Sequence, residues 1–115
     1  MSVNHHFMVM VKEEQLNTIV DRIATKFNPD KIILFGSYAT NSPNSDSDLD
    51  LLIIQDTELP KHKRSFAIYK ALIGVKIPLD ILVYTNDEFE EEKKKRFSFI
   101  NSATKASKLL YERER

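Results

Sequence analysis

Two short apolar runs, separated by a Gly-Ser pair and a polar stretch, most constrain what this 115-residue chain can fold into. Residues 31–35 and 49–55 are too short for ordinary helices and have the composition of buried strands. Residues 36–47 between them are rich in Ser, Asn and Asp, which is typical of a loop with at most one helical turn near residues 37–41. This region therefore predicts two strands joined by a polar loop, with Gly36 at the point where the first strand ends.

Helical periodicity flanks this region on both sides. A first helix is predicted over residues 12–27 and ends before Pro29, because a residue that precedes proline avoids the helical conformation. Residues 1–11 either begin this helix or pack separately. A second helix is predicted from about residue 60 to residue 73, with Thr57 as a candidate cap and Gly74 as its C-terminal cap. The predicted buried stripes are Leu16, Ile19, Val20, Ile23 and Phe27 in the first helix, and Phe66, Tyr69 and Ile73 in the second.

A third strand and a third helix follow. Residues 79–84 are apolar apart from one acid, and Thr85 to Glu88 has the spacing of a capping box, so a helix should run from about residue 86 to about residue 102. Residues 105–115 could extend that helix or form a short edge strand. The order of elements predicts an α/β (α+β) fold, with a small mixed sheet of about three to five strands and helices packed against it.

Composition limits the class of protein. The chain is 42% hydrophobic and 30% charged, has zero formal net charge, and contains no cysteine. We therefore expect a single domain over residues 1–115 in the cytoplasm, without disulfides or a membrane span, and without extended nucleic-acid binding, which usually needs a basic surface.

Three carboxylates and one turn carry the chemical signal. Asp48 and Asp50 are two residues apart at a strand, so they point to the same side at about 6.6 Å spacing and could share a divalent cation. Asp80 is the only charged residue of the third strand, and it joins them if that strand lies beside the second. The Gly36-Ser37 turn close by could hold phosphate oxygens.

In these residues the chain resembles the nucleotidyltransferase superfamily of the DNA polymerase β type, and most of all its minimal nucleotidyltransferase (MNT) branch. The family signature is Gly-Ser, ten residues, Asp-x-Asp and a third acid on a later strand, which Gly36-Ser37, Asp48-Leu49-Asp50 and Asp80 reproduce. The resemblance covers about residues 12–111. It implies the polymerase β-like nucleotidyltransferase fold, with Asp48 and Asp50 binding two Mg²⁺ ions and Asp80 completing one metal site and assisting deprotonation of an acceptor hydroxyl.

The same resemblance implies which residues contact the phosphates of the nucleotide. Gly36 and Ser37 would hold the nucleoside triphosphate, and Ser47 would touch phosphate or metal-bound water. Many relatives have Arg-Gly where this chain has Thr40-Asn41, and the lost arginine removes a possible phosphate contact.

The family also suggests a biological role. Minimal members resemble antitoxins that transfer AMP from ATP onto a tyrosine of a helical HEPN-type toxin, and the short chain leaves no room for an acceptor-binding domain. We therefore expect a Mg²⁺-dependent nucleotidyltransferase that modifies a protein hydroxyl. A non-catalytic antitoxin that acts by binding is the alternative, transfer to a small molecule of the aminoglycoside type is less favoured, and a homodimer is left open.

Other residues admit two interpretations each. The cations of residues 61–64 form either a solvated helix start or a contact for triphosphate or an acidic partner. Tyr38 either stacks on a base or packs. Phe97, Phe99 and Ile100 cannot all face one core, so one of them is a candidate partner contact.

Overall fold

In the computed structural model, residues 2–40 and 48–114 are described, with side chains from residue 13 onward. This part of the chain forms a four-stranded sheet in the order β3-β2-β1-β4, in which β1 is antiparallel to β2 and β4, and β2 is parallel to β3. The predicted mixed sheet is confirmed. The strands are β1 (Lys31–Phe35), β2 (Leu49–Ile54), β3 (Leu79–Tyr84) and β4 (Lys108–Glu112), and the helices are α1 (Ser2–Phe27), α2 (Lys61–Arg64), α3 (Phe66–Ala71), α4 (Asn86–Lys94) and α5 (Phe99–Thr104).

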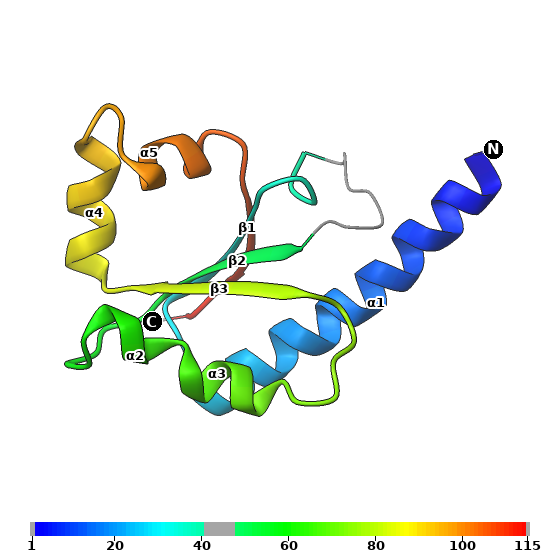
Figure 1. Ribbon diagram of the computed structural model, residues 1–115, viewed down its shortest axis with the longest axis horizontal. Coiled ribbons are helices and arrows are strands. Elements are labelled where there is room, and N and C mark those ends of the chain that lie inside the picture. Colours follow the sequence, from blue (N-terminus) through cyan, green and yellow to red (C-terminus); the bar gives the residue numbers. More distant parts are fainter. Residues whose placement is uncertain (1, 41–47, 115) are drawn as a thin grey trace.

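Helices cover both faces of the sheet (Figure 1), with α1 and α3 on one face and α4 and α5 on the other. Side chains alternate along β2 accordingly: Leu51 and Ile53 face α1 and α3, whereas Leu52 and Ile54 face α4 and α5. All four are fully buried. This alternation fixes the face on which every other β2 side chain lies.

The α1 helix confirms the predicted apolar stripe. Ile19 and Ile23 are fully buried, and Leu16, Val20 and Phe27 pack against the same cluster. The helix begins earlier than its apolar periodicity does, so residues 2–11 are the start of this helix, and it ends at Phe27, before Pro29, as predicted. No helix among the described residues is long and apolar enough to cross a membrane.

The predicted helix over residues 60–73 is wrong in two respects. It is interrupted at Ser65, which separates α2 from α3. The predicted buried stripe is also misplaced, because Phe66 and Ile73 are 73% and 75% exposed, whereas Ile68 and Leu72 are buried. Two apolar stripes compete on this short helix, and packing against α1 and the sheet selects the aliphatic one.

Side chains of α2 and α3 protect the outer edge of β3. The Tyr69 hydroxyl accepts a hydrogen bond from the Ile81 amide at 2.8 Å and donates to the Leu79 carbonyl at 3.4 Å. Arg64 donates from Nη1 to the Val83 carbonyl at 3.3 Å. Exposed strand edges are templates for pairing with another chain, and these contacts occupy backbone groups that such a strand would use. This role explains why Tyr69 is not part of a buried stripe.

The predicted caps have mixed outcomes. The capping box is confirmed, because the Thr85 side chain accepts from the Glu88 amide and the Glu88 side chain accepts from the Thr85 amide. Thr57 is not a helix cap; its hydroxyl accepts from the Leu59 amide in the preceding turn. Gly74 is not the C-cap of α3, which is Leu72; it lies two residues further along with a φ of +100°, a conformation that favours glycine.

The helix predicted to continue to about residue 102 ends at Lys94 instead. The Ser98 side chain donates to the Glu92 carbonyl and accepts from the Asn101 amide at 3.0 Å, so it closes the turn and caps α5. This bend buries Ile100 completely, which a continuous helix along the predicted path does not require.

The C-terminal segment adopts the strand alternative. β4 pairs with β1 at the edge of the sheet opposite β3. Beyond it, Arg113 forms an ion pair with the buried Asp30, which anchors the chain after β4 to the loop before β1. The single-domain assignment of residues 1–115 and the cytoplasmic location stay predictions.

Candidate active site

Parallel pairing places two of the three predicted carboxylates side by side. Asp50 is the second residue of β2 and Asp80 is the second residue of β3, and the two are register partners. Adjacent strands are about 4.8 Å apart, so both side chains leave the sheet as neighbours. By alternation with Leu52 and Leu82 they lie on the face that α4 and α5 cover. Asp48 is exposed and directly precedes β2.

Gly36 lies directly against Asp50. Phe35 is the register partner of Asp50 in the antiparallel β1–β2 pair, and Gly36 follows it with a φ of +76°. A Cβ atom placed on Gly36 would lie 2.1 Å from Oδ2 of Asp50, which is closer than any real contact. The backbone conformation therefore favours glycine at this position, and any larger residue would displace the Asp50 carboxylate.

The pKa of Asp50 is affected by the acids near it. Burial raises the pKa of the Asp50 carboxyl, and the negative charges of Asp80 and Asp48 raise it further. A carboxylate whose neighbours are also acidic is stabilised in its charged form by a cation. Asp80 and Asp48 therefore both lie close enough to influence the Asp50 carboxyl.

The donor set fits a hard divalent cation in its chemistry. Mg²⁺ prefers oxygen ligands and is commonly bound through one or two carboxylates together with substrate phosphates. Asp50 and Asp80 supply such a pair, and Asp48 is a third oxygen donor next to them. Within residues 13–40 and 48–114, however, no three or more acidic, His or Cys side chains are grouped tightly enough to hold a metal ion by themselves.

The turn after Gly36 is internally bonded. The Ala39 amide donates to the Gly36 carbonyl at 3.1 Å, and the Thr40 hydroxyl donates to the Ser37 carbonyl at 3.1 Å. Tyr38 packs against the core cluster on the α1 side, which supports the packing alternative for this residue. Ser47 and Asn41 lie outside the described residues, so their predicted roles stay predictions.

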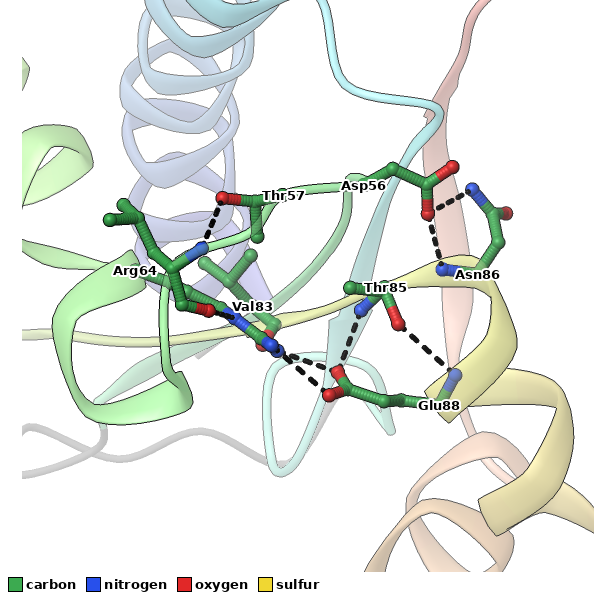
Figure 2. A network of polar contacts seen from close by, with 8 residues as sticks. Asp56, Thr57, Arg64, Val83, Thr85, Asn86 and Glu88 are labelled. Atoms are coloured by element: carbon green, nitrogen blue, oxygen red, sulfur yellow. Dashed lines mark hydrogen bonds and ion pairs between the residues drawn. The ribbon is translucent and has the colours of Figure 1, made fainter.

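The cations of residues 61–64 lie at the opposite end of β3 from Asp80. Figure 2 shows Arg64 pointing at Glu88, with which it makes two hydrogen bonds of 2.6 and 3.1 Å. Lys61 lies 4.4 Å from the ring centre of Tyr84, the last residue of β3. These contacts make Arg64 a structural residue and give no support to a triphosphate contact. The Arg64 contact lowers the pKa of Glu88 to about 2.

One residue on the acid-bearing face of the sheet was not predicted as a site residue. The Phe99 ring lies 5.5 Å from the ring of Phe35, edge to face, on the side of the sheet that carries Asp50. The only sequence signal was that Phe97, Phe99 and Ile100 could not share one core. The structure buries Ile100, leaves Phe97 88% exposed and leaves Phe99 48% exposed.

Comparisons with known proteins agree with this geometry. A family model described as "Nucleotidyltransferase domain" matches residues 16–111. A protein of Methanocaldococcus jannaschii named "Putative protein adenylyltransferase" is 28% identical over 107 residues, which cover 89% of this chain and all of that protein. The crystal structure of a "putative nucleotidyltransferase" from Sulfolobus solfataricus superposes with a TM-score of 0.66 at 19% identity, over 96% of this chain and 90% of that one.

The structural similarity shows the fold, and the family model shows the family. Together with the Gly36 turn beside Asp50 and Asp80, they confirm the resemblance inferred from the sequence motif. Members of this family generally use a nucleoside triphosphate and a divalent metal ion. The chain belongs to the nucleotidyltransferase domain family and is a transferase.

Proposed function

We propose that this protein transfers AMP from ATP to a hydroxyl group of a partner protein, and that it needs Mg²⁺ to do so. The observation that carries the proposal is the in-register pair of Asp50 and Asp80, with Gly36 packed against the Asp50 carboxylate. The name of the M. jannaschii relative, which this chain matches over that protein's full length, favours a protein as the acceptor.

Each residue of the site has a role in this proposal. Asp48, Asp50 and Asp80 would hold Mg²⁺, which would neutralise the phosphates and the leaving pyrophosphate. Asp80 is exposed and so remains accessible to an acceptor, whose hydroxyl proton it would receive. The backbone of Gly36 and Ser37 would hold the triphosphate, since a tight turn after a strand can present amide groups to phosphate oxygens.

The acceptor we favour is a tyrosine of a helical HEPN-type toxin, which would make this chain the antitoxin of a two-component system. This assignment rests on the family resemblance and on the name of the relative. It predicts that the antitoxin acts through chemistry, so that protection and AMP transfer depend on the same carboxylates.

Incubation with labelled ATP, Mg²⁺ and the protein encoded next to this one tests the proposal. We expect label on the partner with the wild type, and a loss of at least 100-fold in Asp50→Asn and Asp80→Asn, because each variant removes one charge from the cation site. Asp21→Asn is the matched control, because Asp21 is exposed on α1, on the opposite face of the sheet.

Two results would contradict the proposal. Equal labelling by the wild type and by Asp50→Asn would exclude these acids from the chemistry. If the Asp50→Asn variant transfers no label but neutralises the partner in cells as well as the wild type does, the protein acts by binding alone.

A further inference from the structure

An exposed aromatic ring borders the candidate active site on the α5 side. Phe99 is the first residue of α5, and its ring packs edge to face on Phe35 with an interplanar angle of 81°. Phe35 is buried, whereas about half of Phe99 remains open to solvent. A half-exposed ring supported by a buried one is a flat apolar surface that is held in place.

The backbone around Phe99 is also held in place. The Ser98 side chain caps α5 through the Asn101 amide, and the Asn101 side chain donates to the Lys93 carbonyl at 2.9 Å. The neighbouring Ile100 is fully buried in the cluster between α5 and the sheet. The ring is therefore oriented before any ligand arrives, which lowers the entropy lost on binding.

This surface lies on the face of the sheet that carries the acids. Phe35 is the register partner of Asp50, and directly opposed residues of antiparallel strands have Cα atoms about 4.5–5.5 Å apart. The ring centre of Phe99 lies 5.5 Å from the ring centre of Phe35, on the same face of the sheet. Phe35 therefore links the Phe99 ring to the strand position beside Asp50, and Gly36 directly follows Phe35 in the chain.

We propose that Phe99 is the stacking surface for the base of the bound nucleotide. The inference rests on the proposed function, in which the phosphates lie between the Gly36 turn and the acids. The ribose then separates the base from the phosphates. Phe99 is a half-exposed aromatic ring on the face that carries the acids, displaced from them by Phe35. Stacking on an aromatic ring is worth about 1–3 kcal/mol per base and tolerates different bases, so ATP and GTP should bind with similar affinity.

Phe97 provides a matched control. It is two residues away and more exposed than Phe99, and the Arg96 guanidinium lies 5.4 Å from its ring centre. No ring contact links it to Phe35 among the described residues. A general loss of apolar surface should therefore affect both variants, whereas a loss of base stacking should affect only Phe99.

Calorimetric titration with Mg²⁺-ATP and with Mg²⁺-tripolyphosphate, which lacks both the base and the ribose, tests the proposal. We expect Phe99→Ala to weaken ATP binding by about 5- to 150-fold and to leave tripolyphosphate binding within about twofold of the wild type. Phe99→Tyr should retain ATP binding, and Phe97→Ala should change neither ligand. Phe99→Leu keeps an apolar contact with Phe35 without the aromatic face, so it tests stacking even if the alanine variant folds poorly.

Several results would overturn the inference. Unchanged ATP binding in both Phe99→Leu and Phe99→Ala would exclude stacking, and equal weakening of ATP and tripolyphosphate would show a structural effect. Normal ATP binding with lost transfer to the partner would assign Phe99 to the acceptor instead. If the wild type binds no nucleotide, the proposed function fails as well, whereas failure of the Phe99 variants alone leaves it standing.

Discussion

Replacing Gly36 with alanine should separate the geometry of the site from the stability of the fold. The added Cβ would lie 2.1 Å from Oδ2, 3.1 Å from Cγ and 3.4 Å from Cβ of Asp50. The Asp50 carboxylate must then rotate away from its position beside Asp80. We therefore expect the variant to fold and to lose transfer activity.

The second glycine of the chain supplies the matched control. Gly74 also has a positive φ, +100°, but a Cβ placed there would meet no atom within 4 Å. Both substitutions force an L-residue into a left-handed conformation, which costs roughly 1–2 kcal/mol. For a domain of this size that corresponds to a loss of about 4–8 °C in melting temperature. The cost to stability should therefore be similar, whereas only Gly36→Ala disturbs Asp50.

The assay is single-turnover transfer of labelled AMP to the partner, alongside thermal unfolding of each variant. A displacement of about 1 Å in a catalytic group can cost about 100-fold in rate, so Gly36→Ala should fall by about that factor. Gly74→Ala should stay within about threefold of the wild type at a temperature where both variants are folded. Equal activity of the two alanine variants would refute the argument that Gly36 is required for the position of Asp50.

Three further predictions concern the polar contacts of β3 and α4. The ion pair with Arg64 lowers the pKa of Glu88 to about 2, so the pair adds stability above pH 4.5 and loses it as the pH falls toward about 2. The full shift corresponds to at most about 3 kcal/mol of unfolding free energy. Because the Glu88 side chain is 31% exposed, solvent screening reduces this to about 1–2 kcal/mol. Urea unfolding at pH 7 and pH 3 should show this loss in the wild type and a flatter response in Glu88→Gln; identical profiles would disprove it. Thr85→Ala should cost about 1 kcal/mol in the same assay, because the Glu88 amide loses its cap, and an unchanged midpoint would count against the capping box. Tyr69→Phe should cost about 1 kcal/mol and speed hydrogen exchange of the Ile81 amide, whose acceptor it removes; unchanged exchange would show that another group takes over.

The strands could be predicted from the sequence because each is short, apolar and bounded by residues that break regular structure. β1 and β3 have the predicted bounds, and β2 differs by one residue. The start of α4 could also be predicted, because the Thr85 cap is a local interaction whose two partners lie three residues apart. Such features need no knowledge of the rest of the fold.

The helices between and after the strands were less predictable, for a physical reason. Residues 66–73 carry two apolar stripes, and only tertiary contacts decide which one is buried. The aromatic stripe contained Tyr69, whose hydroxyl is needed at the edge of β3, so the choice depended on a strand more than ten residues away. The end of α4 could not be predicted either. Charged residues spaced three apart, as in a helix, run up to Lys95, so nothing in the sequence indicates the turn that Ser98 closes.

The parallel register of β2 and β3 connects the sequence motif to the site. An Asp-x-Asp pair and a lone acid on another strand share a face only if the strands pair with the right parity, because a shift of one residue would turn Asp80 toward α1. The apolar alternation sets that parity: Leu51 and Ile81 must face α1 and α3, and Leu52 and Leu82 must face α4 and α5. The hydrophobic core therefore holds Asp50 beside Asp80, although burial and the negative charges of Asp80 and Asp48 raise the pKa of the Asp50 carboxyl. Burial of the core thus keeps side by side two acids whose like charges would otherwise drive them apart.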